Sequence, residues 1–312
     1  MGIRGIRGVV PVWACLAISP MGHCADVTRA AIDFLGREVP RWQRENHCFS
    51  CHNNGDGARA LLLAKMRGYA LPPDALADTL EWLRKPAAWD VAHSNPGFSD
   101  RKLARIQFSA ALAEAVQDGA GQARDDLARA AELMLPLQGS DGAWKIDTGG
   151  VTGAPATYGS ALATYMARRT LETADQTRFE AAIAKTNRWL REATPSNVLD
   201  RAAILLALPD TAAKHLRPLL AAQNSDGGWG PQPHAPSEAF DTALALVALH
   251  GVADAARTVA IARGRAFLAK FQLNDGSWPE TTRPSGFVSY AERISTAGWA
   301  AYALLSTDAE RH

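Results

Sequence analysis

Cysteine is scarce in this chain of 312 residues, which contains only Cys15, Cys24, Cys48 and Cys51. The first two fall within the N-terminal 25 residues, so the rest of the chain holds a single pair. No second pair remains to complete a zinc site with four ligands. At this length, however, the chain can bury a substantial hydrophobic core.

The chain also lacks an excess of charge of either sign, β-strand signals and long hydrophobic runs. Its 33 basic and 32 acidic residues give a net charge of +1, so no global field indicates nucleic acid or an anionic membrane as a partner. Runs of β-branched residues and Asn-Gly turns are scarce, whereas alanine and leucine are abundant. These features predict an all-α protein. Beyond residue 25, no segment has enough consecutive apolar residues to be predicted as a membrane helix.

The N-terminal segment has the pattern of a secretory signal peptide. Two arginines precede a short apolar stretch from Val9 to Ile18, and Ala25 offers a cleavage point, although His23 departs from the small residue usual at that position. We therefore predict a signal peptide at residues 1–25, a single mature domain at residues 26–312, and a periplasmic or secreted location. The alternative is a disordered cytosolic N-terminus.

The remaining cysteines lie in a Cys-Phe-Ser-Cys-His motif, whose reactive residues are Cys48, Cys51 and His52. In an exported chain, two cysteines three positions apart and followed by histidine match a c-type haem attachment site. Each thiol would add to one haem vinyl group, and His52 would be the proximal ligand of the iron. The motif predicts one covalent haem c, in a segment at about residues 44–70. The alternatives are a disulfide between the two cysteines and a thioredoxin-type redox pair, which needs a βαβ setting that the sequence lacks.

Three later segments share a turn that begins with glutamine and contains an Asp-Gly pair and a tryptophan. A short helical pattern precedes each turn, the Asp-Gly pair ends that first helix, and an alanine-rich second helix follows. These helix-loop-helix units are about 40 to 50 residues long, within the range of known repeat arrays. The turns are Gln138 to Trp144, Gln223 to Gly230 and Gln272 to Glu280.

These turns resemble the QW motifs of the superfamily of squalene-hopene cyclases and protein prenyltransferases. The resemblance implies an all-α fold, the α/α toroid, in which an inner ring of helices surrounds a central cavity and an outer ring wraps it. With degenerate copies counted, the chain has about six units. The first unit pairs a helix at Ala30 to Gln43 with a helix at Ala58 to Tyr69, so we expect the haem motif in the loop of the first repeat.

In such a ring, the loops from first to second helix lie on one face, at the mouth of the cavity. We expect the loop residues His93 and His234 on that face, and His93, from the neighbouring repeat, is the candidate sixth ligand of the iron. Arg283 and Arg293 come from the last repeat, which would close on the first. We expect one of these arginines to pair with a haem propionate.

The catalytic motifs of the resembled superfamily are incomplete in this sequence. Class II terpene cyclases use an Asp-x-Asp-Asp-Thr-Ala motif whose central aspartate protonates the substrate, and the closest match here is Glu238 to Ala243. Phe240 stands at the position of the proton donor and cannot protonate an alkene, and Asp241 is then expected to be a helix N-cap. Prenyltransferases bind zinc through Asp, Cys and His, and no free cysteine remains for that role. Neither activity is predicted, and a haem-dependent oxidoreductase is the enzyme class left open.

The leading expectation is an exported c-type haem protein for electron transfer or haem-dependent redox chemistry, with an unknown redox partner in the periplasm. A second is a protein that binds or processes a small hydrophobic ligand in the toroid cavity, with haem auxiliary. A third is a module that docks a partner redox enzyme. The second helices are mostly alanine, leucine and threonine, with Tyr158, Tyr165 and Trp299 as aromatic exceptions, which disfavours a terpene-type pocket.

Covalent haem attachment can be tested after expression in a host with haem-maturation machinery. Because thioether bonds survive unfolding, we expect the denatured protein to give a pyridine haemochrome spectrum. Replacing Cys48 and Cys51 together by alanine should abolish that spectrum, whereas His47→Ala, next to the motif, should retain it. A denatured wild-type chain without the spectrum would contradict the attachment.

Overall fold

The structure is a computed structural model that describes residues 20–91, 101–119 and 123–308. Over these ranges the chain forms twelve α-helices and no β-strand, with one isolated bridge between Trp229 and Glu238. The prediction of an all-α protein is confirmed. None of the described helices is long and apolar enough to cross a bilayer.

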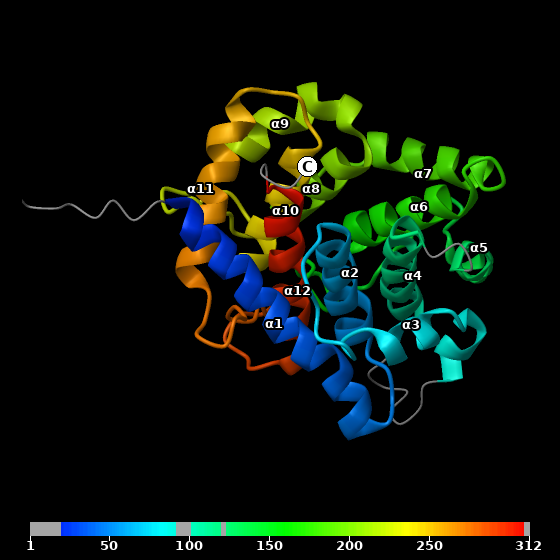
Figure 1. Cartoon of the computed structure of the whole chain (residues 1–312). Helices are drawn as coiled ribbons and strands as arrows, with labels where there is room; N and C mark the ends of the chain where they lie inside the picture. Colours follow the sequence, from blue (N-terminus) through cyan, green and yellow to red (C-terminus); the bar gives the residue numbers. More distant parts are fainter. Residues whose placement is uncertain (1–19, 92–100, 120–122, 309–312) are drawn as a thin grey trace, which may run out of the picture.

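The helices form six consecutive pairs that build two concentric rings (Figure 1). The second helix of each pair contacts the second helices of the neighbouring pairs, and α12 contacts α2, so the inner ring is closed. The inner helices are α2 (Ala58–Met66), α4 (Arg101–Gln117), α6 (Ser160–Asp175), α8 (Val198–Ala207), α10 (Ala239–His250) and α12 (Tyr290–Ser306). The outer helices are α1 (Pro20–Asn46), α3 (Ala77–Leu83), α5 (Ala123–Met134), α7 (Glu180–Glu192), α9 (Ala212–Ala221) and α11 (Ala256–Phe271). The predicted α/α toroid of six helix pairs is confirmed.

The distribution of apolar residues explains which helices lie inside. Ten of the 12 residues of α10 are buried, against three of the ten residues of α9, which precedes it in the same pair. A helix that is apolar all round is stable only when it is covered on all sides, whereas an amphipathic helix needs cover on one face. The alternation of these two kinds of helix along the chain therefore produces the inner and outer rings.

The three glutamine-tryptophan turns attach the third, fifth and sixth helix pairs to the next outer helix. In the first turn, Gln138 donates from Nε2 to the carbonyl oxygens of Gly142, in the same turn, and of Ala182 on α7, both at 3.0 Å. The indole N–H of Trp144 donates to the carbonyl oxygen of Met134, at the end of α5, at 3.2 Å. The same arrangement recurs where Gln223 donates to Ala260 on α11 and where Gln272 donates to Val27 on α1.

The third of these turns closes the ring. Gln272 follows α11, and its amide donates to the carbonyl oxygen of Val27 on α1 at 2.9 Å. Gly276, in the same turn, has a φ of +93° and packs directly on the backbone of Ala30. In Figure 1, α11 (orange) and α1 (blue) lie side by side. Backbone-directed hydrogen bonds thus join the first and last helix pairs.

The sequence had predicted the haem motif in a loop, but only the first part of the motif lies in one. Helix α1 ends at Asn46, Cys48 lies in the connection, and a π-helical segment, η1 (Cys51–Gly57), then runs directly into α2. The hydroxyl of Ser50 accepts a hydrogen bond from the backbone N–H of His52 at 3.2 Å and caps this segment. The second half of the motif is therefore the first turn of an inner-ring element.

Close backbone contacts hold η1 inside the ring. A Cβ on Gly298 of α12 would lie 2.9 Å from the backbone of Asp56, and a Cβ on Gly55 would lie 3.1 Å from Gln107 of α4. Glycine at both contacts lets η1 lie against α4 and α12 at once. This position carries Asp56 into the interior of the ring.

Helix α1 begins at Pro20, ahead of the predicted cleavage point after Ala25. The contacts that close the ring are made at Val27 and Ala30, both beyond that point. The signal peptide, the domain boundary at residue 26 and the exported location stay predictions.

The closing turn can be tested through its glycine. Gly276→Ala adds a strained φ, costing about 1–2 kcal/mol, and a collision with α1 that costs about 1–3 kcal/mol more. Gly286 has a similar φ of +97° and open space around its Cα, so Gly286→Ala carries the first effect alone. We expect the free energy of unfolding, measured by denaturant titration, to fall clearly more in Gly276→Ala. Equal losses would show that packing on α1 contributes nothing.

Candidate functional site

Polar and aromatic side chains from several inner-ring elements meet inside the ring. Helices α2 and α6 are not ring neighbours, yet Nη1 of Arg59 lies 3.3 Å from Sδ of Met166. Helices α4 and α12 are not neighbours either, yet the hydroxyl of Tyr302 donates to Glu114 at 3.2 Å. Such contacts cross the interior. We use the name interior cluster for Asp56, Arg59, Gln107, Tyr158 and Trp299.

Asp56 is the acidic group of the interior cluster and is only 1% exposed. Tyr158 donates a short hydrogen bond to Oδ1, and Nε2 of Gln107 donates to Oδ2 at 2.9 Å. Burial raises the pKa of Asp56 to about 6, against the opposing charge of Arg59 and hydrogen bonds from Tyr158, Ser295 and Gln107. Neutral donors therefore already occupy both oxygens of this carboxyl group.

Tyr158 reaches Asp56 from the loop that precedes α6. Its φ of +61° lies in the left-handed region, which non-glycine residues seldom adopt. Gly153 packs directly on the backbone of Tyr158, where no side chain would fit. A strained backbone at a buried polar contact is typical of functional sites.

Arg59 is the basic group of the interior cluster and is 2% exposed. Its guanidinium lies 3.9 Å from the ring centroid of Trp299 and 4.4 Å from that of Tyr302. Nη1 contacts the sulfur of Met166, while Nε and Nη2 have no hydrogen-bond partner among the described residues. A buried cation with unpaired donors is costly, so this arrangement needs an explanation.

A second arginine, Arg169 of α6, is partly buried and has a carboxylate partner. Its Nη2 pairs with Oε2 of Glu114 at 2.7 Å, and Glu114 also accepts a hydrogen bond from Tyr302. Glu114 is 1% exposed, so one member of this pair lies away from water. The contrast with Arg59 shows that the chain can supply a carboxylate to an arginine in this region.

The sequence had predicted Asp241 as the N-cap of α10, and this prediction is wrong. Glu238 occupies the N-cap position and its side chain makes no capping bond, while Asp241 pairs with the guanidinium of Arg283, which also binds Glu238 at 2.8 Å. Asp241 is fully buried, and a buried arginine needs an opposite charge more than the helix end needs a cap. Burial, with Glu238 sharing the same arginine, raises the pKa of Asp241.

The residues of the predicted haem site lie together at the start of η1. Cys48 and Cys51 are partly buried and are not joined in a disulfide. Nδ1 of His52 lies 3.1 Å from Oγ of Ser295, and Nε2 lies 3.7 Å from Sγ of Cys51. Desolvation lowers the pKa of His52 to about 4. The donor set fits haem c in kind, because Ser295 occupies Nδ1 and leaves Nε2 for iron.

The other residues predicted around the haem are placed differently or lie outside the described ranges. Arg283 pairs with two carboxylates, and Arg293 pairs with Asp275 at 2.6 Å. His234 is exposed in the loop before α10, and His93 falls outside the described residues. Their roles toward haem stay predictions. Within the described ranges, no group of three or more His, Cys, Asp or Glu side chains is arranged to hold a metal ion.

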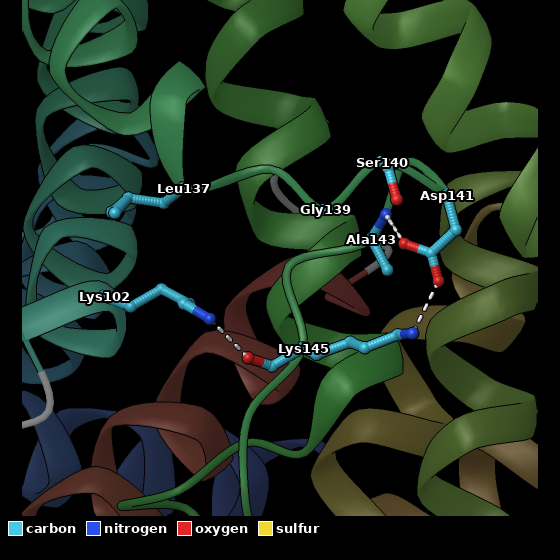
Figure 2. Close-up of a pocket in the computed structure, with 7 residues that line it drawn as sticks. All are labelled: Lys102, Leu137, Gly139, Ser140, Asp141, Ala143 and Lys145. Atoms are coloured by element: carbon cyan, nitrogen blue, oxygen red, sulfur yellow. Dashed lines mark hydrogen bonds and ion pairs between the residues drawn. The ribbon is translucent and has the colours of Figure 1, made fainter.

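A surface pocket of about 470 Å³ lies beside the first glutamine-tryptophan turn, away from the interior cluster (Figure 2). Nζ of Lys102 donates to the carbonyl oxygen of Lys145 at 2.8 Å, and Nζ of Lys145 pairs with Asp141 at 2.7 Å. Both ammonium groups are thus engaged by the protein, and none of the residues that line the pocket belongs to the interior cluster.

Comparison with known proteins supports the fold and leaves the family open. No family model matches the sequence, and no curated protein matches it. Among solved structures, a variant of the type II terpene cyclase MstE from Scytonema with geranylgeranyl dihydroxybenzoate shares 15% identity at a TM-score of 0.54, covering 92% of this chain and 97% of that chain. The apo enzyme shares 15% identity at a TM-score of 0.53, covering 91% of this chain and 98% of that chain. A protein from Actinoplanes shares 16% identity at a TM-score of 0.54, covering 91% of this chain and 99% of that chain. At these identities the likeness establishes a terpene-cyclase-like helical fold.

The leading expectation from sequence, electron transfer or haem-dependent redox chemistry, is wrong. Several of the solved structures that share this fold over nearly its whole length are of the type II terpene cyclase MstE, in complex with a geranylgeranyl substrate or with merosterolic acid A as product. They agree better with the alternative of a protein for a hydrophobic ligand. Nothing in these similarities supports a redox partner.

Sequence analysis missed the interior cluster. It singled out Tyr158 and Trp299 as isolated aromatics, and gave no role to Asp56, Arg59 or Gln107. One feature could have indicated them: Asp56 and Arg59 are three residues apart, hence on one helical face, at the start of an otherwise apolar inner helix. The partners on other helices could not be found in this way, because only the ring closure brings them together.

The titration of Glu292 on α12 gives a test of the buried acids. Its side chain accepts a hydrogen bond from the N–H of Ala156 at 2.8 Å, and burial raises its pKa from 4.5 to about 7. Because the folded state holds this proton more tightly than the unfolded state, the stabilisation is complete below pH 4.5 and is lost as the pH rises through about 7.

Glu292→Gln keeps the acceptor oxygen and removes the titration. We therefore expect the fall in Tm from about pH 5 to about pH 8 to be smaller in this variant than in the wild type. Glu180→Gln, an exposed change on α7, should follow the wild-type profile. Three superimposable profiles would rule out a protonated Glu292 in the folded chain.

Proposed function

We propose that the chain binds a small hydrophobic ligand of the prenyl type inside the ring. The observation that supports this most is the aromatic surround of Trp299. Its ring centroid lies 5.9 Å from that of Tyr158, 5.9 Å from that of Phe240 and 6.4 Å from that of Tyr302. These rings come from three different parts of the inner ring, and aromatic faces suit the unsaturated chain of a prenyl group.

The similar structures add to the proposal. MstE, which shares the fold, was crystallised with a geranylgeranyl compound. This chain has a similar helical architecture and brings Tyr158, Phe240 and Trp299 together inside the ring, where a ligand enclosed by inner helices would contact them. The ligand class that we propose is therefore a prenyl chain or a prenylated compound.

Binding is proposed rather than alkene protonation. Phe240, fully buried, stands where the resembled cyclases carry their proton donor. Both oxygens of Asp56 accept hydrogen bonds within the chain, from Tyr158 and from Gln107, so this carboxyl group is already engaged by the protein. Any chemistry on the ligand would therefore begin differently from an acid-initiated cyclisation.

Export and a single covalent haem c remain further proposals, with the haem in an auxiliary role. Cys48 and Cys51 would hold it through thioether bonds, with Nε2 of His52 toward the iron. When bound, the group would supply a redox-active iron. What this chain itself contributes is the orientation of the imidazole, through the contact between Nδ1 of His52 and Ser295.

Titration calorimetry with geranylgeraniol tests the proposed binding. We expect saturable binding with a negative change in heat capacity, because apolar surface is buried. Phe240→Leu removes an aromatic ring inside the ring of helices and should weaken binding about three- to tenfold. Phe271→Leu makes the same change on the outside of α11, where Phe271 is 41% exposed, and should leave the affinity unchanged.

Two results would contradict the proposed function. One is the absence of saturable binding by the wild-type chain. The other is a loss of affinity in Phe271→Leu together with an unchanged affinity in Phe240→Leu, which would locate the ligand on the outer surface.

A further inference from the structure

Arg59 presents an open pair of donors inside the ring. The aromatic rings of Trp299 and Tyr302 lie against its guanidinium, and Nη1 contacts the sulfur of Met166. The two nitrogens left over, Nε and Nη2, form the side-on fork of an arginine, which matches the two oxygens of a carboxylate or a phosphate. This fork is buried and unpaired.

The nearest acid does not fill this fork. Oδ1 of Asp56 accepts from Tyr158, and Oδ2 accepts from Gln107. Asp56 and Arg59 attract each other electrostatically, yet the hydrogen bonds that Asp56 accepts come from neutral donors. The indole N–H of Trp299 is also buried without an acceptor. Three unpaired donor nitrogens on two stacked side chains thus belong to one site.

Two partly buried arginines elsewhere in the described structure have carboxylate partners, although Nε of Arg283 is itself unpaired. Arg169 pairs with Glu114, and Arg283 pairs with Glu238 and Asp241. Leaving such donors unpaired away from water is unfavourable, since each loses its hydration without compensation. Arg59 is therefore the position where an acceptor from outside the chain would restore the balance.

We propose that Arg59 binds the anionic head group, a carboxylate or a phosphate, of the prenyl ligand. This inference rests on the proposed function and narrows its ligand class to prenyl anions. The head group would accept from Nε and Nη2 of Arg59, while the apolar chain would lie along the aromatic rings. Stacking on Trp299 and Tyr302 fixes the plane of the guanidinium, so little order is lost on binding.

Three probes with the same prenyl chain test the head-group site: geranylgeraniol, geranylgeranoic acid and geranylgeranyl monophosphate. We expect at least one of the two anions to bind the wild-type chain about tenfold or more tightly than the alcohol, because a charge-assisted bidentate contact is added. Comparison of the two anions distinguishes a carboxylate ligand from a phosphate ligand. This measurement needs no variant.

Variants locate the effect. Arg59→Met keeps the length and apolar stem of the side chain and should bring the three affinities together. Arg169→Met removes the partly buried arginine of this region and should retain the preference for anions, although its Tm falls because Glu114 loses its partner. Arg59→Lys should recover only part of the preference, because an ammonium lacks the planar fork.

The outcomes separate this inference from the proposed function. Equal wild-type affinities for alcohol and anions would overturn the head-group site and leave prenyl binding intact, with buried water as the partner of Arg59. A preference for anions that persists in Arg59→Met would also overturn it. Failure of all three probes to bind would overturn both.

Discussion

The hydrogen bonds of the three turn glutamines join successive helix pairs through the outer ring. Each of these side chains bridges its own turn and the backbone of the next outer helix, so the outer helices are linked through main-chain carbonyl groups rather than through side-chain packing alone. The glycine that follows in each turn permits the close approach. Because the contact is made to the backbone, the sequence of the receiving helix can vary while the ring persists.

Side chains that point into a closed ring of helices are removed from water, so their polar groups need partners within the ring. The interior of this ring is not purely apolar: Asp56, Arg59 and Glu114 are buried there, and Arg169 is partly buried beside Glu114. Buried charges are tolerated when they are paired, as Glu114 and Arg169 are. Nε and Nη2 of Arg59 have no partner, and its guanidinium lies beside the rings of Trp299 and Tyr302. Polar recognition and an apolar wall are thus combined at one point.

The sequence predicted the architecture well because the determinants of the fold are local. Gln138, Asp141 and Trp144 lie within seven consecutive residues, and such turns are recognisable wherever they recur. Hydrophobic patterning then distinguishes inner from outer helices. The position of η1 was harder to foresee, since it depends on Gly298, far away in the chain, which leaves room for its backbone.

The site was predicted poorly because its determinants are not local. Arg59 and Met166 are 107 residues apart, and Asp56 and Tyr158 are 102 apart, so no motif could join them. The Cys-Phe-Ser-Cys-His motif drew the functional hypothesis toward redox chemistry because it is compact and chemically distinctive. Asp241 was misread for a related reason: its place near a helix start was visible in the sequence, whereas its partner Arg283 was not.

The bond from Gln272 to Val27 also sets an order of events during synthesis. Helix α1 leaves the ribosome long before the turn that receives it, so its contacts with α11 and α12 form only after those helices have been made. Until then α1 is covered only by η1, α2 and α3, and a chain that stops before α12 keeps an open edge.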